Sequence, residues 1–231
     1  MLGLAVIFWS LYMMLSKKVH FHLGGEIALH VGIFDYYFYS SYNTTVRIGI
    51  DVSQVAYEGT GVSQFIVNLV EHLVRIDKNN QYILFFSSLR KQFLISNFKF
   101  LNKSLPRRQA GQIQNSNFKI KTFKFPPSLL DLLWNRLHIL PIEWLIGDVD
   151  VFITSDWTEP PTRIAKKATI LYDLIVYKYP NETDKKIVET QKRKLRWVKK
   201  ESKIIFCISE ATKRDAMEIL GIPENRLRIL V

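Results

Sequence analysis

The chain has 231 residues, of which 48% are hydrophobic and 23% are charged, and its formal net charge is +11. This composition is that of a globular protein that can bury a core. It excludes the possibility that the chain as a whole is disordered or fibrous. The single cysteine, Cys207, excludes a disulfide within the chain and fits a reducing cytoplasm, and none of the five histidines has a Cys, Asp or Glu partner at metal spacing, so no metal site is predicted.

The first 45 residues form an atypical N-terminal extension. Their apolar run, residues 2–15, is shorter than the ~20 residues that span a bilayer. Lys17 and Lys18 follow this run, whereas a signal peptide carries its positive charge before it. Three interpretations compete: a short membrane anchor, a disordered tail, or upstream sequence wrongly joined to the protein. We favour the last, because fold-like patterning starts abruptly at Val46.

From residue 46 the sequence alternates between strands and helices. Runs rich in β-branched and aromatic residues predict seven strands, at 46–52, 82–88, 118–125, 150–154, 168–172, 203–209 and from 227 onward. Helical periodicity predicts helices at 62–76, 128–147 (interrupted at Pro141), 182–201 and 209–220. Such alternation is typical of an α/β fold, so residues 46–231 are predicted to form one Rossmann-like domain, a mostly parallel sheet with helices on both faces. Residues 88–117 are predicted to be an exposed, basic loop region.

The loop before the first helix is a candidate anion site. Gly59, Thr60 and Gly61 lie directly before the helix, where backbone N–H groups and the positive end of the helix dipole attract an anion. No Lys-Ser/Thr pair follows, so this is not a phosphate-binding P-loop. The alternative is an ordinary tight turn that needs glycine.

Acidic and aromatic residues follow two of the predicted strands, where open α/β sheets bind ligands. Asp156 and Glu159 after the fourth strand could contact a ligand, and Trp157 could stack on a sugar ring; the alternative is a Pro-shaped loop with a partly buried Trp. Asp173 ends the fifth strand, and here the alternative is an Asx-turn or a helix cap.

The positive charge is unevenly distributed. No acidic residue lies between Asp77 and Asp131, an interval with ten basic residues, which predicts either a surface for anionic lipid or phosphate or merely a solvated one. The helix at 182–201 carries eight basic residues diluted by four acidic ones, so it is interpreted as a solvated outer helix. Nucleic acid is not a predicted partner, because no recognised nucleic-acid module is present.

Four segments, residues 46–77, 150–161, 169–180 and 204–231, resemble in order and spacing the successive landmarks of the N-terminal domain of family-4 glycosyltransferases. The resemblance covers about four-fifths of the chain. It implies the N-terminal half of a GT-B fold, two Rossmann-like domains facing across a cleft. It also implies transfer of a sugar from a nucleotide-sugar donor to a saccharide or lipid-linked acceptor, with retained configuration and without a metal or further cofactor.

The resemblance also assigns roles to residues. Asp173 stands at the catalytic mouth, and Tyr172 takes a position that is usually His in the family, where Tyr can donate a hydrogen bond but cannot be a cation near neutral pH. Gly59 to Gly61 match the glycine loop that approaches the donor phosphates and the acceptor. Ser209 and Glu210 match a structural Ser-Glu pair.

In the family, a second domain holds most of the donor nucleotide, and no such domain follows Val231 here. The expectation is therefore an incomplete enzyme, completed by further sequence or by a separate chain that carries the donor-binding domain. The alternative is a non-catalytic Rossmann-like module that binds an anionic membrane surface or a partner chain, in the cytoplasm or at the inner face of the membrane.

Overall fold

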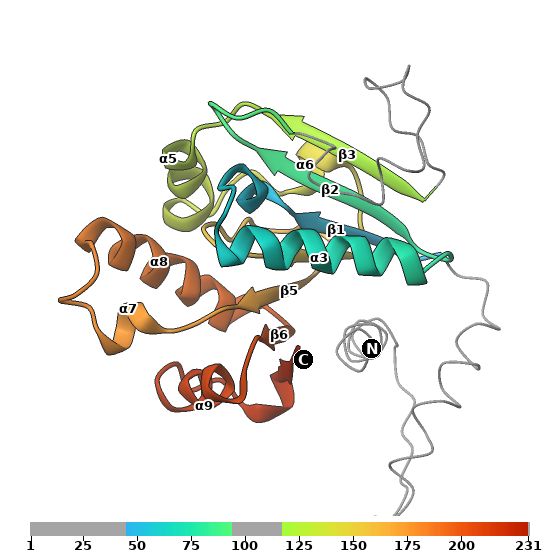
Figure 1. Ribbon diagram of the computed structural model, residues 1–231. Coiled ribbons are helices and arrows are strands. Elements are labelled where there is room, and N and C mark those ends of the chain that lie inside the picture. Colours follow the sequence, from blue (N-terminus) through green and yellow to red (C-terminus); the bar gives the residue numbers. More distant parts are fainter. Residues whose placement is uncertain (1–44, 94–116, 231) are drawn as a thin grey trace, which may run out of the picture.

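The computed structural model describes residues 45–93 and 117–230, which contain one seven-stranded sheet (Figure 1). Its strand order is β3-β2-β1-β4-β5-β6-β7, and every neighbouring pair is parallel. The strands are β1 (Arg47–Asp51), β2 (Gln81–Ser87), β3 (Phe118–Phe123), β4 (Val151–Thr154), β5 (Lys166–Leu171), β6 (Ile204–Cys207) and β7 (Leu227–Ile229). The predicted α/β, Rossmann-like class and all seven predicted strands are confirmed.

The longer helices connect the strands in the predicted positions. The helices are η1 (Ser53–Ala56), α3 (Gly61–Ile76), α5 (Pro127–Leu130), the π-helical turn η3 (Asp131–Arg136), α6 (Glu143–Ile146), α7 (Ile175–Lys178), α8 (Lys185–Glu201), α9 (Glu210–Glu218) and η4 (Glu224–Arg226). The helical segment predicted at 128–147 is interrupted near Pro141 as predicted, and the chain leaves helical geometry a few residues earlier, with positive φ at His138 and Leu140. The short helix α7 was not predicted.

One face of the sheet, here called the α3 face, is covered by α3 and is apolar (Figure 1). Alternate residues of β1 and β5, such as Ile48, Ile50, Ala168 and Ile170, point to this face and are at most 2% exposed. Burial of such side chains supplies most of the folding free energy, at ~25 cal/mol per Å² of apolar area.

The opposite face, here called the α8 face, holds two apolar clusters with polar groups between them. One cluster lies under η3 and α6 and includes Trp134 and Phe152, and the other lies under α8 and α9 and includes Leu195 and Cys207. Cys207 is fully buried and packs as a small hydrophobic residue. On β5 this face carries Lys167 and Thr169, so the strand is polar on one side only.

Most of the predicted N-terminal extension (1–45) and of the predicted basic loop region (88–117) lies outside the described residues. Within residues 45–93 and 117–230, no helix combines the length and the hydrophobicity needed to cross a bilayer.

Candidate functional site

The topological switch point of the sheet lies between β1 and β4. Strand order runs from β1 through β2 to β3 on one side and from β4 to β7 on the other. β1 and β4 pair through Ile50 and Ile153, so their carboxyl ends open side by side. Ligands of open α/β sheets bind in the crevice outside the carboxyl ends at such a point. The residues that follow these two strands are therefore the first candidates for a binding site.

Two carboxylates lie at this edge. Asp51, the last residue of β1, is 3% exposed, and its Oδ1 accepts a hydrogen bond from the Ser53 N–H at 2.9 Å. Burial raises the pKa of the Asp51 carboxyl to about 6 against the lowering effect of Ser53. Burial also raises the pKa of Asp156. The negative charge of Asp156 repels that of Asp51 and raises the pKa of Asp51 further. Asp156 thus lies at the predicted edge, beside Asp51, a residue that the sequence analysis missed.

Gln54 links the two strand ends through its side-chain amide. In the orientation that satisfies both of its ends, the amide nitrogen donates to the Asp51 carbonyl at 3.2 Å, and the amide oxygen accepts the Asp156 N–H at 2.9 Å. The amide therefore fixes the start of one loop against the start of the other. Assignment of the amide orientation follows from these partners.

Tyr172 directly follows β5 and contacts the loop that follows β4. Its hydroxyl hydrogen-bonds Ser155 Oγ at 2.8 Å, and its ring packs edge-on against Phe65 of α3 with centroids 5.6 Å apart. Burial raises the pKa of Tyr172 above its ordinary value of 10.0, so the hydroxyl stays neutral. Tyr172 is thus a neutral hydrogen-bonding group beside the Ser155–Asp156 turn.

Asp173, the next residue, is exposed and forms a local turn. Its Oδ1 accepts a hydrogen bond from the Ile175 N–H at 3.1 Å, which is the Asx-turn that the alternative interpretation predicted. The carboxylate also raises the pKa of Asp156, so it lies near that group. Asp173 therefore borders the site, with one of its oxygens engaged in the turn.

The glycine loop lies at the same edge, at the N-terminus of α3. Thr60 is the N-cap: its Oγ1 accepts from the Ser63 N–H at 3.2 Å and donates to the Tyr57 carbonyl at 2.8 Å. Gly59 has a φ of 82°, a left-handed conformation that disfavours other residues. A Cβ on Gly61 would meet nothing within 4 Å, so crowding within the described residues does not explain this glycine.

Tyr57, which directly follows η1, is a second tyrosine near the two carboxylates. Its side chain is 46% exposed, and burial together with the charges of Asp156 and Asp51 raises the pKa of its hydroxyl. An exposed aromatic face beside carboxylates suits the ring of a sugar, whose C–H groups pack on the aromatic face while its hydroxyls donate to the carboxylates. Tyr57 had not been predicted as a site residue.

Two residues that were predicted to contact a ligand, Glu159 and Trp157, form hydrogen bonds within the protein. Glu159 is fully buried, with hydrogen bonds to Thr154 Oγ1 at 2.6 Å and to Ser202 Oγ at 3.3 Å and an ion pair with Lys167 at 3.1 Å. The prediction that Glu159 contacts a ligand is therefore wrong. Trp157 is half-buried, and its carbonyl accepts from Asn135 Nδ2 at 2.9 Å.

Helix α8 differs from its predicted interpretation at one basic residue, Lys194. This helix was interpreted as a solvated outer helix, but Lys194 is 2% exposed, and its Nζ donates to the Ser155 carbonyl. Burial lowers the pKa of Lys194, while Glu159, Asp156 and Asp51 oppose that shift. Helical periodicity could have indicated this burial. Lys194 is three residues after Gln191 and four before Val198, so it lies on the inner face of the helix.

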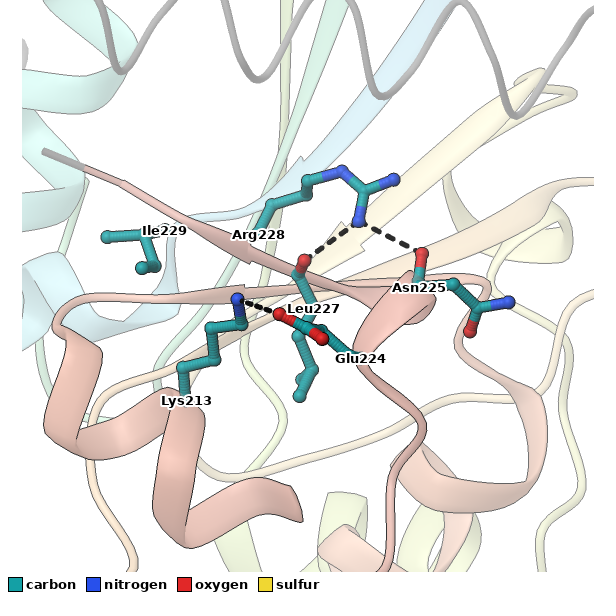
Figure 2. Close-up of a pocket in the computed structure, with 6 residues that line it drawn as sticks. All are labelled: Lys213, Glu224, Asn225, Leu227, Arg228 and Ile229. Carbon is teal, nitrogen blue, oxygen red and sulfur yellow. Dashed lines mark hydrogen bonds and ion pairs between the residues drawn. The ribbon is translucent and has the colours of Figure 1, made fainter. Parts of the chain in front are cut away.

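The described residues also contain a surface pocket, which lies away from the switch point, between α9 and β7 (Figure 2). It is lined by Lys213, Glu224, Asn225, Leu227, Arg228 and Ile229. Its polar side chains engage one another and the backbone: Lys213 pairs with Glu224 at 2.7 Å, and Arg228 Nη1 donates to the Asn225 carbonyl at 2.9 Å. None of the predicted site residues lines this pocket.

No group of three or more His, Cys, Asp or Glu residues within the described part of the chain is arranged to hold a metal ion.

Comparison of the sequence with models of protein families finds no match. A search among curated proteins finds no similar protein either.

Proposed function

We propose that residues 46–230 form the acceptor-side domain of a retaining glycosyltransferase, with the acceptor saccharide or lipid-linked sugar bound at the switch point. The observation that carries the proposal is the convergence of two carboxylates and two tyrosines, Asp51, Asp156, Tyr57 and Tyr172, at the carboxyl ends of the paired strands β1 and β4. The same edge carries the segments that resemble family-4 glycosyltransferases.

In this proposal the half-buried Asp156 accepts hydrogen bonds from acceptor hydroxyls, and Tyr57 packs against the sugar ring. The α3 N-terminus with Gly59 and Gly61 faces the diphosphate of the nucleotide-sugar, where N–H groups and the helix dipole stabilise the leaving phosphate. The bond from the anomeric carbon to the phosphate oxygen breaks, a bond from that carbon to the acceptor oxygen forms, and the proton of the acceptor hydroxyl passes to the leaving diphosphate.

The donor nucleotide would be held mostly by a second domain, as the resemblance implies, so transfer needs that domain in the same chain or in a partner chain. Asp173, which borders the site, would then face the donor across the cleft. Trp157, half-buried one residue after Asp156, lines the acceptor side.

Membrane binding is a second candidate function, compatible with the first. Lys119 and Lys121 are exposed on the edge strand β3, two residues apart and therefore on one side of the strand. A basic edge of this kind attracts anionic lipid, which would bring a lipid-linked acceptor near the site. Binding of the chain to vesicles of anionic lipid that weakens as salt rises would support this role.

The test of the acceptor site is saturation-transfer NMR of the 231-residue chain with a panel of methyl glycosides at millimolar concentrations. We expect at least one glycoside to bind, and Asp156→Asn to reduce its binding. The matched control is Asp148→Asn, which removes an exposed carboxylate in the loop before β4, at the opposite edge of the sheet. Binding of no glycoside, or an equal loss in both variants, would refute the acceptor site.

A further inference from the structure

Lys194 is the only buried residue among the eight basic residues of α8. A buried ammonium loses its hydration, which is costly unless the protein supplies hydrogen bonds and opposite charge. Leu195 and Val198 show that an apolar side chain suits this face of the helix. A lysine at this position therefore needs a reason other than packing.

The contacts of α8 with the switch point give that reason. Lys194 Nζ donates to the Ser155 carbonyl, and Gln191, one turn earlier, donates from Nε2 to the Asp156 carbonyl at 3.1 Å. Two side chains of one helix thus hold two successive carbonyls of the same turn. Ser155 in turn bonds the Tyr172 hydroxyl, so the orientation of Asp156 and that of Tyr172 both depend on this turn.

The charge of Lys194 has a separate effect. The charged groups that act on the ammonium come from three segments: Glu159 and Asp156 from the loop after β4, Asp51 from β1, and Lys167 from β5. Lys167 pairs with Glu159 at 3.1 Å and with Glu201 at 2.9 Å. Lys194 also lies near Asp51 and Asp156, and its charge lowers the pKa of both carboxyls.

We propose that Lys194 is a positioning residue of the switch-point site, which fixes the Ser155–Asp156 turn and holds an ammonium group beside the carboxylates of Asp51 and Asp156. This inference rests on the proposed acceptor site for its ligand, but the electrostatic role of Lys194 can be tested without one. The residue acts through Asp156 and does not itself touch the substrate.

The test combines Lys194→Met with Lys167→Met, a matched control that removes the other buried lysine. Titration of the aspartate side-chain carboxyls by ¹³C NMR should show the pKa of Asp51 about one unit higher in Lys194→Met, because a nearby opposite charge is lost. The same pKa should not change in Lys167→Met. Lys194→Gln, which keeps a donor for the Ser155 carbonyl without the charge, should give the same shift, and serves if the Met variant does not fold.

Binding of a methyl glycoside that the wild type recognises should fall about tenfold in Lys194→Met and recover in Lys194→Arg, which restores charge and donors. An Asp51 pKa that is unchanged in both neutral variants, or equally shifted in Lys167→Met, overturns the role of Lys194 even if sugars bind. A shifted pKa in a protein that binds no sugar supports the role of Lys194 and refutes the acceptor site instead.

Discussion

The two faces of the sheet differ in how they are held. On the α3 face, β5 contributes Ala168 and Ile170 to one continuous apolar cluster. On the α8 face, the same strand contributes Lys167 and Thr169, and the buried charged residues of the described chain lie on this side or at its edge: Asp51, Glu143, Glu159, Lys167 and Lys194. Apolar contacts are non-directional, whereas buried ionic groups require defined partners. The α3 face is therefore held by apolar packing, whereas the α8 face combines apolar clusters with ionic groups that fix the positions of side chains near the switch point.

The largest expected effect comes from removing a cation on the α8 face. Lys167→Met leaves the fully buried Glu159 without its ion-pair partner, which should lower the free energy of unfolding by about 3–5 kcal/mol. On the α3 face of the same strand, Ile170→Val should cost only about 0.5–1.5 kcal/mol. Urea unfolding of both variants measures the difference, and equal losses would show that the two faces do not differ in this way.

The pH dependence of stability should trace partly to Asp51. Its folded-state pKa of about 6 exceeds the ordinary value of 3.8, so the folded protein binds this proton more tightly than the unfolded chain does. The resulting stability is complete below pH 3.8 and is lost as pH rises through about 6, a loss of about 3 kcal/mol. In Asp51→Asn this component should be absent. Thermal unfolding of both proteins between these pH values tests it, and parallel pH profiles would contradict it.

A smaller effect is expected where β1 approaches its neighbours on the α8 face. A Cβ on Gly49 would lie 2.7 Å from Phe152 Cδ2 and 3.0 Å from Ile146 Cδ1. Gly49→Ala should therefore cost about 1–3 kcal/mol through overpacking. Gly61→Ala, where a Cβ meets nothing within 4 Å, is the control and should be neutral or slightly stabilising. Chemical denaturation compares them, and an unaffected Gly49→Ala protein would mean that the core yields at this point.

The smallest expected effects concern the helix that covers each face. Asp184 caps α8 by accepting from the Lys186 N–H at 2.8 Å, and Thr60 caps α3 through the Ser63 N–H at 3.2 Å. Either residue changed to Ala should cost about 1 kcal/mol. Asp184→Ala should in addition weaken hydrogen-exchange protection in the first turn of α8 and leave α3 unchanged. Loss of protection in both helices would contradict independent capping.

Part of the candidate site was predictable from residue order alone. Asp156 follows a buried strand and Gly59 precedes a helix, and the parallel-sheet rule brings such positions to one edge. The local hydrogen bond of Asp173, an Asx-turn, was also among the predicted interpretations. Lys194 was missed because a helix with eight basic residues indicates a solvated surface, and the partners that make burial tolerable are Ser155, Asp156 and Glu159, more than 30 residues earlier in the chain.

The sequence by itself determined the α/β class, the seven strands and most helix positions, because periodicity and capping are local properties of the chain. It also determined which polar residues would follow the strands. Only the tertiary structure decided that Glu159 is buried in an ion pair and that Lys194 reaches the switch point. These outcomes depend on which distant segment supplies the hydrogen-bond partner or the opposite charge, and that partner is set by packing across the sheet.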